Sequence, residues 1–117
     1  MKFMMACSSL AFACFSSIAQ AQVIHDLPVS NVTLVKEQAG SGRVTGVLTN
    51  TSGRKLESVV VQFTILDGEG TQIATAQDAA MGVAQDGKWR FAAPYITSTG
   101  NVASVKLGNI MAVPAQQ

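Results

Sequence analysis

Apolar and polar residues alternate along the middle of the chain, and short clusters of Gly, Asn, Asp and Ser interrupt the alternation. The pattern is strongest between residues 43 and 91. Such alternation, bounded by turn residues, is typical of half-buried β-strands. It predicts an all-β fold, an immunoglobulin-like antiparallel β-sandwich of about seven short strands, with an open barrel as the alternative. The clearest strands are residues 31–37, 43–50, 56–66, 71–77, 89–93 and 101–112, with a looser connection over 78–88.

The segment from Leu56 to Leu66 is the strongest of these strands. One face carries Val59, Val61, Phe63 and Ile65, and the other carries Val60, Gln62 and Thr64. An apolar Val60 on the second face indicates a central strand that is partly covered on both sides. Gly46, in the middle of the strand before it, indicates a bulge or the close approach of a neighbouring backbone.

The first 21 residues have the pattern of a secretory signal peptide. Lys2 precedes an apolar stretch over 3–15, and the small-residue site Ala19-Gln20-Ala21 follows. We predict cleavage before Gln22 and export to the periplasm or the cell surface. The mature chain then divides into an extended N-terminal segment over 22–30, a β-sandwich domain over 31–112 and a C-terminal tail over 113–117.

Both cysteines, Cys7 and Cys14, lie inside this leader. After cleavage the chain would have no thiol and no disulfide, so its stability must come from an apolar core. Residues 10–14 loosely resemble a lipobox, in which case Cys14 would be acylated. The better A-x-A site downstream makes soluble processing the preferred interpretation.

The charge balance argues against two classes of partner. Removing Lys2 leaves seven basic and seven acidic residues, which alternate along the chain without forming a block. Binding to nucleic acid needs a basic surface that neutralises phosphates, and none is visible. Nothing after Ala21 is apolar enough to insert into a membrane.

Three runs of residues resemble the FxLYD domain, a family of small exported bacterial domains. They are Val44-x-Gly46-x-Leu48-x-Asn50, then Phe63-Thr64-Ile65-Leu66-Asp67-Gly68, then Gly87-Lys88-Trp89-Arg90-Phe91. Ile65 and Leu66 replace the family's Leu and Tyr, so a role that depends on the tyrosine ring does not carry over. The resemblance implies an immunoglobulin-like sandwich and assigns no activity. The expected fold-motif residues are Asn50, Phe63, Ile65, Leu66, Asp67, Gly68, Trp89 and Phe91.

No set of residues predicts catalysis, a metal site or a cofactor. His25 is the single histidine, and without cysteine or a second histidine it cannot build a usual zinc site. Asp67, Glu69 and Asp78 lack the spacing of a calcium loop, so a hairpin turn is expected, with Asp67 bonding to backbone N–H groups and Gly68 taking a positive φ. Trp89 alternates with Phe91, which favours a core position over a surface platform.

The preferred functional hypothesis is therefore a non-catalytic protein–protein interaction module, accessory or structural, within an envelope assembly. The apolar segments 23–29 and 110–114 are candidates for strand addition to a partner or to a second copy. The alternative hypothesis is a carrier that binds a small ligand in the sandwich core or at a loop end.

Overall fold

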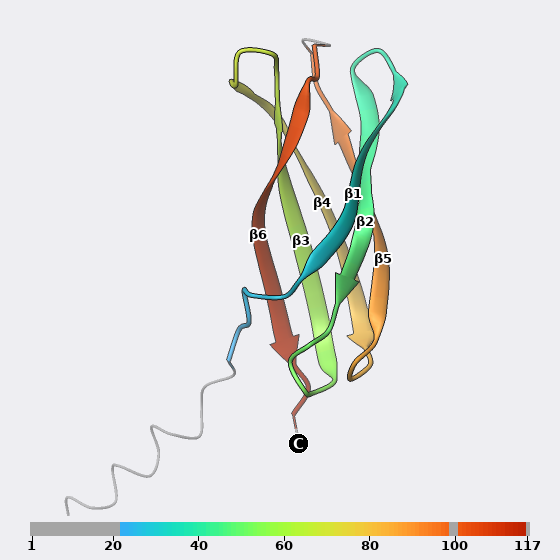
Figure 1. The fold of residues 1–117 in the computed structure, drawn as a ribbon, viewed down its shortest axis with the longest axis vertical. Helices are drawn as coiled ribbons and strands as arrows, with labels where there is room; N and C mark the ends of the chain where they lie inside the picture. The colour runs from blue at the N-terminus through green and yellow to red at the C-terminus, as the bar shows by residue number, and fades with distance from the viewer. Residues whose placement is uncertain (1–21, 99–100, 117) are drawn as a thin grey trace, which may run out of the picture.

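The computed structural model describes residues 22–98 and 101–116, and these residues form two antiparallel sheets. One sheet has the order β1-β2-β5 and the other has the order β4-β3-β6 (Figure 1). The strands are β1 (Val29–Gln38), β2 (Ser41–Thr49), β3 (Leu56–Leu66), β4 (Gln72–Val83), β5 (Lys88–Ile96) and β6 (Ser104–Pro114). The all-β class predicted from the alternation is confirmed.

The described residues contain six strands, so the expectation of about seven is wrong. The reason lies in the segment after Gln77, which was expected to be a loose connection. There β4 continues to Val83, and its partner β3 pairs with it along almost its whole length, from Leu56 opposite Val83 to Leu66 opposite Gln72. A hairpin through Ala84 and Gly87 then leads directly into β5.

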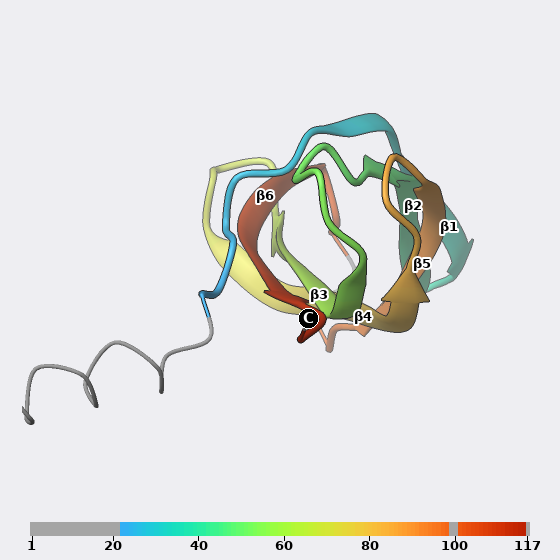
Figure 2. The ribbon, with the colours of Figure 1, turned by 90° about the horizontal axis from the view of Figure 1, so that it is seen from below.

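Each sheet has two edge strands, and only one edge of each sheet lies against the other sheet. Seen from the end, the strands surround a common core, with β4 and β5 side by side (Figure 2). The remaining edge strands are β1 and β6, which belong to different sheets and do not pair with one another. We call the space between them the β1–β6 seam.

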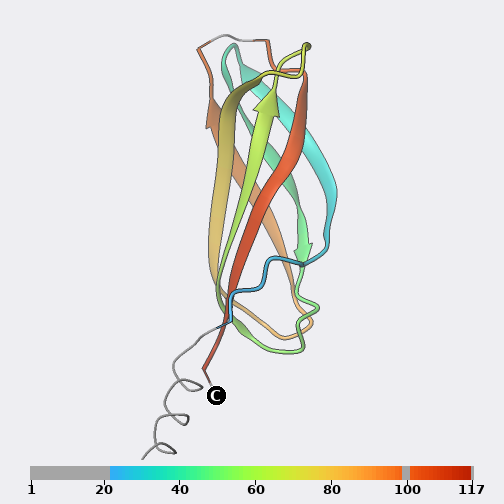
Figure 3. The same ribbon diagram turned by 90° about the vertical axis from the view of Figure 1, so that its left-hand side faces the viewer.

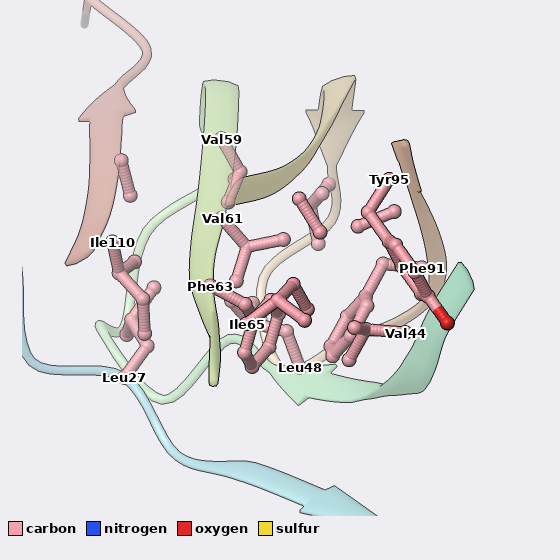
Figure 4. Packing of buried hydrophobic residues seen from close by; sticks show 14 of the residues in the cluster. Leu27, Val44, Leu48, Val59, Val61, Phe63, Ile65, Phe91, Tyr95 and Ile110 are labelled. Atoms are coloured by element: carbon pink, nitrogen blue, oxygen red, sulfur yellow. The ribbon is translucent and has the colours of Figure 1, made fainter. Parts of the chain in front are cut away.

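The core lies between the two sheets and is filled by alternate residues of each strand. In β3 the side chains of Val59, Val61, Phe63 and Ile65 are buried, whereas Val60, Gln62 and Thr64 are only partly buried (Figure 4). Both the facing of this strand and its central position match the prediction. Burial of these apolar side chains is the main stabilising contribution in a domain without disulfide bonds among its described residues.

Gly46 is required by close packing. A Cβ atom at this position would lie 2.6 Å from Cζ of Phe91 and 3.0 Å from the backbone oxygen of Ser30. The close approach predicted for Gly46 is therefore confirmed, with the Phe91 ring and the first strand as the neighbours.

The segment before β1 is packed against the sandwich. Ile24 pairs with Ala112 of β6 through two backbone hydrogen bonds of 2.8 and 2.9 Å, and Leu27 is buried in the core. At the other end β6 continues to Pro114, which is also buried. The packed unit thus includes residues on both sides of 31–112. The predicted signal peptide, with Cys7 and Cys14, lies outside the described residues.

Candidate functional site

The aromatic residues singled out from the sequence meet in the core. Phe63 of β3 and Phe91 of β5 have ring centroids 5.3 Å apart, so they link the two sheets. Trp89 meets Phe91 edge to face at 5.8 Å and is half-buried against the core. Ile65 is fully buried and Leu66 partly buried. These residues hold the sheets together and offer no open binding platform.

Asn50 organises the lower end of the sandwich from a fully buried position at the end of β2. Its Nδ2 donates to the carbonyl oxygens of Arg54 at 2.7 Å and Ala84 at 2.9 Å. Its Oδ1 accepts from the backbone N–H and the hydroxyl of Ser52 at 3.1 and 2.6 Å. The side chain therefore joins the β2–β3 loop to the β4–β5 hairpin with all its hydrogen-bonding capacity in use.

Asp67 closes the β3–β4 turn at the opposite end. Its Oδ1 accepts from the backbone N–H groups of Glu69 and Thr71, both at 2.9 Å, as predicted for this side chain. The prediction for Gly68 is wrong, because Gly70 takes the positive φ of 81°. The N–H of Gly70 bonds to the oxygen of Asp67, so the loop is a three-residue turn whose last residue needs glycine.

The described residues contain no group of three or more His, Cys, Asp or Glu side chains that could hold a metal ion. His25 is exposed, and its Nδ1 lies 2.7 Å from the oxygen of Ile110, to which the Nδ1–H tautomer of the ring donates a hydrogen bond. No helix in the described part of the chain is long and apolar enough to span a membrane.

The edge between β4 and β5 is sealed by Asp78. Its Oδ2 accepts from the backbone N–H of Ala92 at 2.8 Å, and its Oδ1 accepts from the N–H of Ala79. An acidic side chain thus occupies an outward N–H of β5 and discourages pairing with another strand. The residues around Asp78 did not predict this role from the sequence, although a charge on the core side of an edge strand is one way in which proteins protect that edge.

The edge of β6 is only partly covered. The segment before β1 occupies its lower end through Ile24 and His25, and then leaves it to enter β1 (Figure 3). Above that point, between Ser104 and Asn109, no strand among the described residues pairs with the outer side of β6. Leu107 pairs with Phe63 and so lies on the core side of the sheet, yet it is 45% exposed.

The outer face of the β4-β3-β6 sheet divides into an apolar and a polar half. The register places Ala79, Val60 and Met111 side by side, and in the next row Met81, Ser58 and Val113. Met81 is 77% exposed and Met111 is 43% exposed. Farther along, Gln77, Gln62 and Asn109 form a polar row. We call the apolar half, made of Val60, Ala79, Met81, Met111 and Val113, the methionine patch.

A cavity of about 480 Å³ opens at the upper end of the molecule. Its walls are Lys36 of β1, the turn from Asp67 to Glu69 and residues 101–103 before β6. A second, of about 280 Å³, also has Lys36 in its wall and extends to Tyr95. Burial, and then the negative charge of Glu37, raise the pKa of Tyr95.

Three features of the described residues are thus candidates for binding: the free edge of β6, the methionine patch and the upper cavity. Comparison with known proteins found no family model, no curated protein and no solved structure that matches this chain.

Proposed function

We propose that this chain is a non-catalytic protein–protein interaction module of the periplasm or the cell surface, an accessory or structural component of an envelope assembly. The observation that carries the proposal is the methionine patch. Met81 and Met111 leave large apolar side chains in solvent on the outer face of one sheet. Exposed apolar patches of this kind are typical of surfaces that bind another protein.

The chemistry of the patch favours a protein partner. Methionine side chains are flexible and polarisable, so they adapt to the shape of an apolar partner. The patch residues carry no charge, and the adjoining row of Gln77, Gln62 and Asn109 provides a neutral polar rim. An apolar centre with a polar rim is the usual composition of an interface. Export through the predicted signal peptide and kinship with the FxLYD family are part of the same proposal.

The test compares two lysine variants of the exported chain. Met111→Lys places a charge within the patch, and Gln77→Lys places the same charge on the same sheet outside it. Pull-down from envelope extracts and size-exclusion chromatography with light scattering measure association. We expect the wild-type chain and Gln77→Lys to retain a partner that Met111→Lys loses. If wild type is an inert monomer that captures nothing, the proposal is wrong.

A second candidate function is a small-ligand carrier, which the cavity of about 480 Å³ supports. Its volume falls within the range of ligand sites, about 300–1,000 Å³. Lys36, Asp67 and Glu69 line it, so a ligand with polar groups of both signs would fit. A thermal-shift screen of metabolites, lipids and metal ions tests this function, because a specific ligand raises the melting temperature by mass action. A Lys36→Ala variant should lose the shift.

A further inference from the structure

We infer that the upper half of the β6 edge, from Ser104 to Asn109, accepts an extended, uncharged, alternately apolar segment of another protein as an added strand. The inference rests on the proposed function and names the surface and the kind of partner. The chain would be the acceptor of a strand and not its donor. Its terminal segments are already used within the fold, since Ile24 pairs with Ala112 and Leu27 is buried.

The backbone of β6 supports this directly. The backbone N–H and C=O of Ala112 both bond to Ile24, so they point away from β3. Ala112 and Ile110 stand opposite Val59 and Val61. Beyond the irregularity between Asn109 and Leu107, the residues opposite Phe63 and Ile65 are Leu107 and Val105. They therefore continue the alternation in which Ala112 and Ile110 stand. Because alternate residues direct their peptide groups to opposite sides of a strand, Leu107 and Val105 offer theirs to the free edge.

The lower half of the same edge already accepts an extended strand. Ile24 and Ala112 form an antiparallel bridge with hydrogen bonds in both directions. An incoming segment would therefore continue a pairing that the chain itself begins. It would lie above the point where the segment before β1 leaves β6 (Figures 1 and 3).

The side chains around the seam define what the segment must carry. Leu107 is on the core side but 45% exposed, because no strand of the facing sheet covers it. Val105 packs against the core beside it, and across the seam β1 contributes Leu34, partly buried, and Val32, 42% exposed. Alternate apolar side chains of an added strand would fill this space, as in other cases of strand addition to a sheet edge.

From Ser104 to Leu107 the edge lacks the protection seen elsewhere in the molecule, because β6 pairs with β3 there without interruption and its register irregularity lies between Leu107 and Asn109. Asp78 seals the edge of β5 next to β4, and β1 has register irregularities at both ends and a positive φ at Asn31. Bulges and inward charges of this kind discourage pairing. Between Ser104 and Asn109 the one charged residue is Lys106, which pairs with Thr64 on the outer face and leaves the edge open.

A second copy of the chain is a less suitable occupant. The antiparallel register that pairs Val105 with Leu107 of a second β6 sets the two Lys106 side chains directly opposite one another. Like charges in that position destabilise a strand pair. A segment of a different protein, without charge at the facing position, avoids this repulsion.

The experiment uses a synthetic peptide in which valine and threonine alternate, with a lysine at each end and both termini blocked. The control peptide has proline in place of the central threonine. Amide hydrogen exchange of the exported chain, followed by NMR, reports on Val105 and Leu107. Both amides should exchange rapidly in the free chain. The first peptide should slow both by about tenfold or more, as expected for hydrogen-bonded amides, and the proline peptide should not.

Two variants of β6 serve as matched tests. Leu107→Pro removes an outward N–H, which an edge strand tolerates on its solvent side, and should abolish binding of the peptide. Thr75→Lys, on the outer face of β4 and separated from β6 by β3, should bind it as wild type does. If Leu107→Pro fails to fold, Leu107→Lys introduces a charge at the same edge and should also abolish binding.

The inference is overturned if the peptide does not bind at millimolar concentration or leaves both amides unchanged, or if Leu107→Pro binds it normally. A dimer whose Val105 and Leu107 amides are protected without peptide would assign the edge to self-association and also overturn it. The proposed function fails separately: an envelope partner lost by Met111→Lys, with no peptide binding at β6, would leave that function standing.

Discussion

Replacing Phe63 by alanine tests whether the two sheets depend on a single aromatic contact. The ring is 1% exposed, comes from the central strand β3 and lies 5.3 Å from the ring of Phe91 in the facing sheet. Withdrawing such a side chain from water contributes about 1.5–3 kcal/mol. The cavity left behind and the lost ring contact add to this, so truncation should lower the free energy of unfolding by about 3–5 kcal/mol.

Urea denaturation measures this change, and an unaltered slope with a lower midpoint would identify it as a loss of stability. Thr64→Ala is the matched control, because Thr64 is the next residue of β3 and faces the outer side of the sheet. It should cost no more than about 1 kcal/mol. A loss below about 1 kcal/mol for Phe63→Ala would show that the ring is not buried and that the facing assigned to β3 is wrong.

Three further predictions concern the ends of the sandwich and its packing. Asn50→Ala removes the buried amide that donates to the carbonyl oxygens of Arg54 and Ala84, and it should cost about 2–4 kcal/mol by urea denaturation. A cost below about 1 kcal/mol would refute the loop-bridging role. Gly46→Ala places a methyl 2.6 Å from Phe91 and should destabilise by about 1–3 kcal/mol, and a neutral result would contradict the close packing. The folded state raises the pKa of Tyr95 above 10.0, so the unfolded state releases the phenol proton first and stability should fall as pH rises beyond that value. Melting temperatures measured up to alkaline pH check this, and Tyr95→Phe should reduce the fall.

The alternation along the chain was a reliable guide where a strand has one buried face. The facing of β3 could be predicted because its core residues occupy every second position and its partner strands lie on both sides. The extent of β4 could not, because Ala79, Ala80 and Gly82 give little hydrophobic contrast between the two faces. Its continuation depends on pairing with β3, which local sequence does not encode.

Turn residues were predicted by type more successfully than by position. Asp67 accepts the expected backbone hydrogen bonds, but the sequence holds two glycines after it and the longer loop uses the second. The methionine patch and the free edge of β6 could not be predicted from the sequence. Met81 and Met111 are distant in sequence, and only the register of three strands brings them to the same sheet face. The exposure of Leu107 depends on where the segment before β1 leaves β6.

The most direct test of the account is whether this chain binds another protein through the β4-β3-β6 sheet. A photoreactive benzophenone side chain introduced separately at Leu107, Met111 and Arg90 would report contacts in intact cells, with Arg90 as the exposed control on the opposite sheet. The account predicts cross-links to one and the same protein from Leu107 and Met111, and none from Arg90. Equal cross-linking from all three positions, or none from Leu107 and Met111, would contradict it.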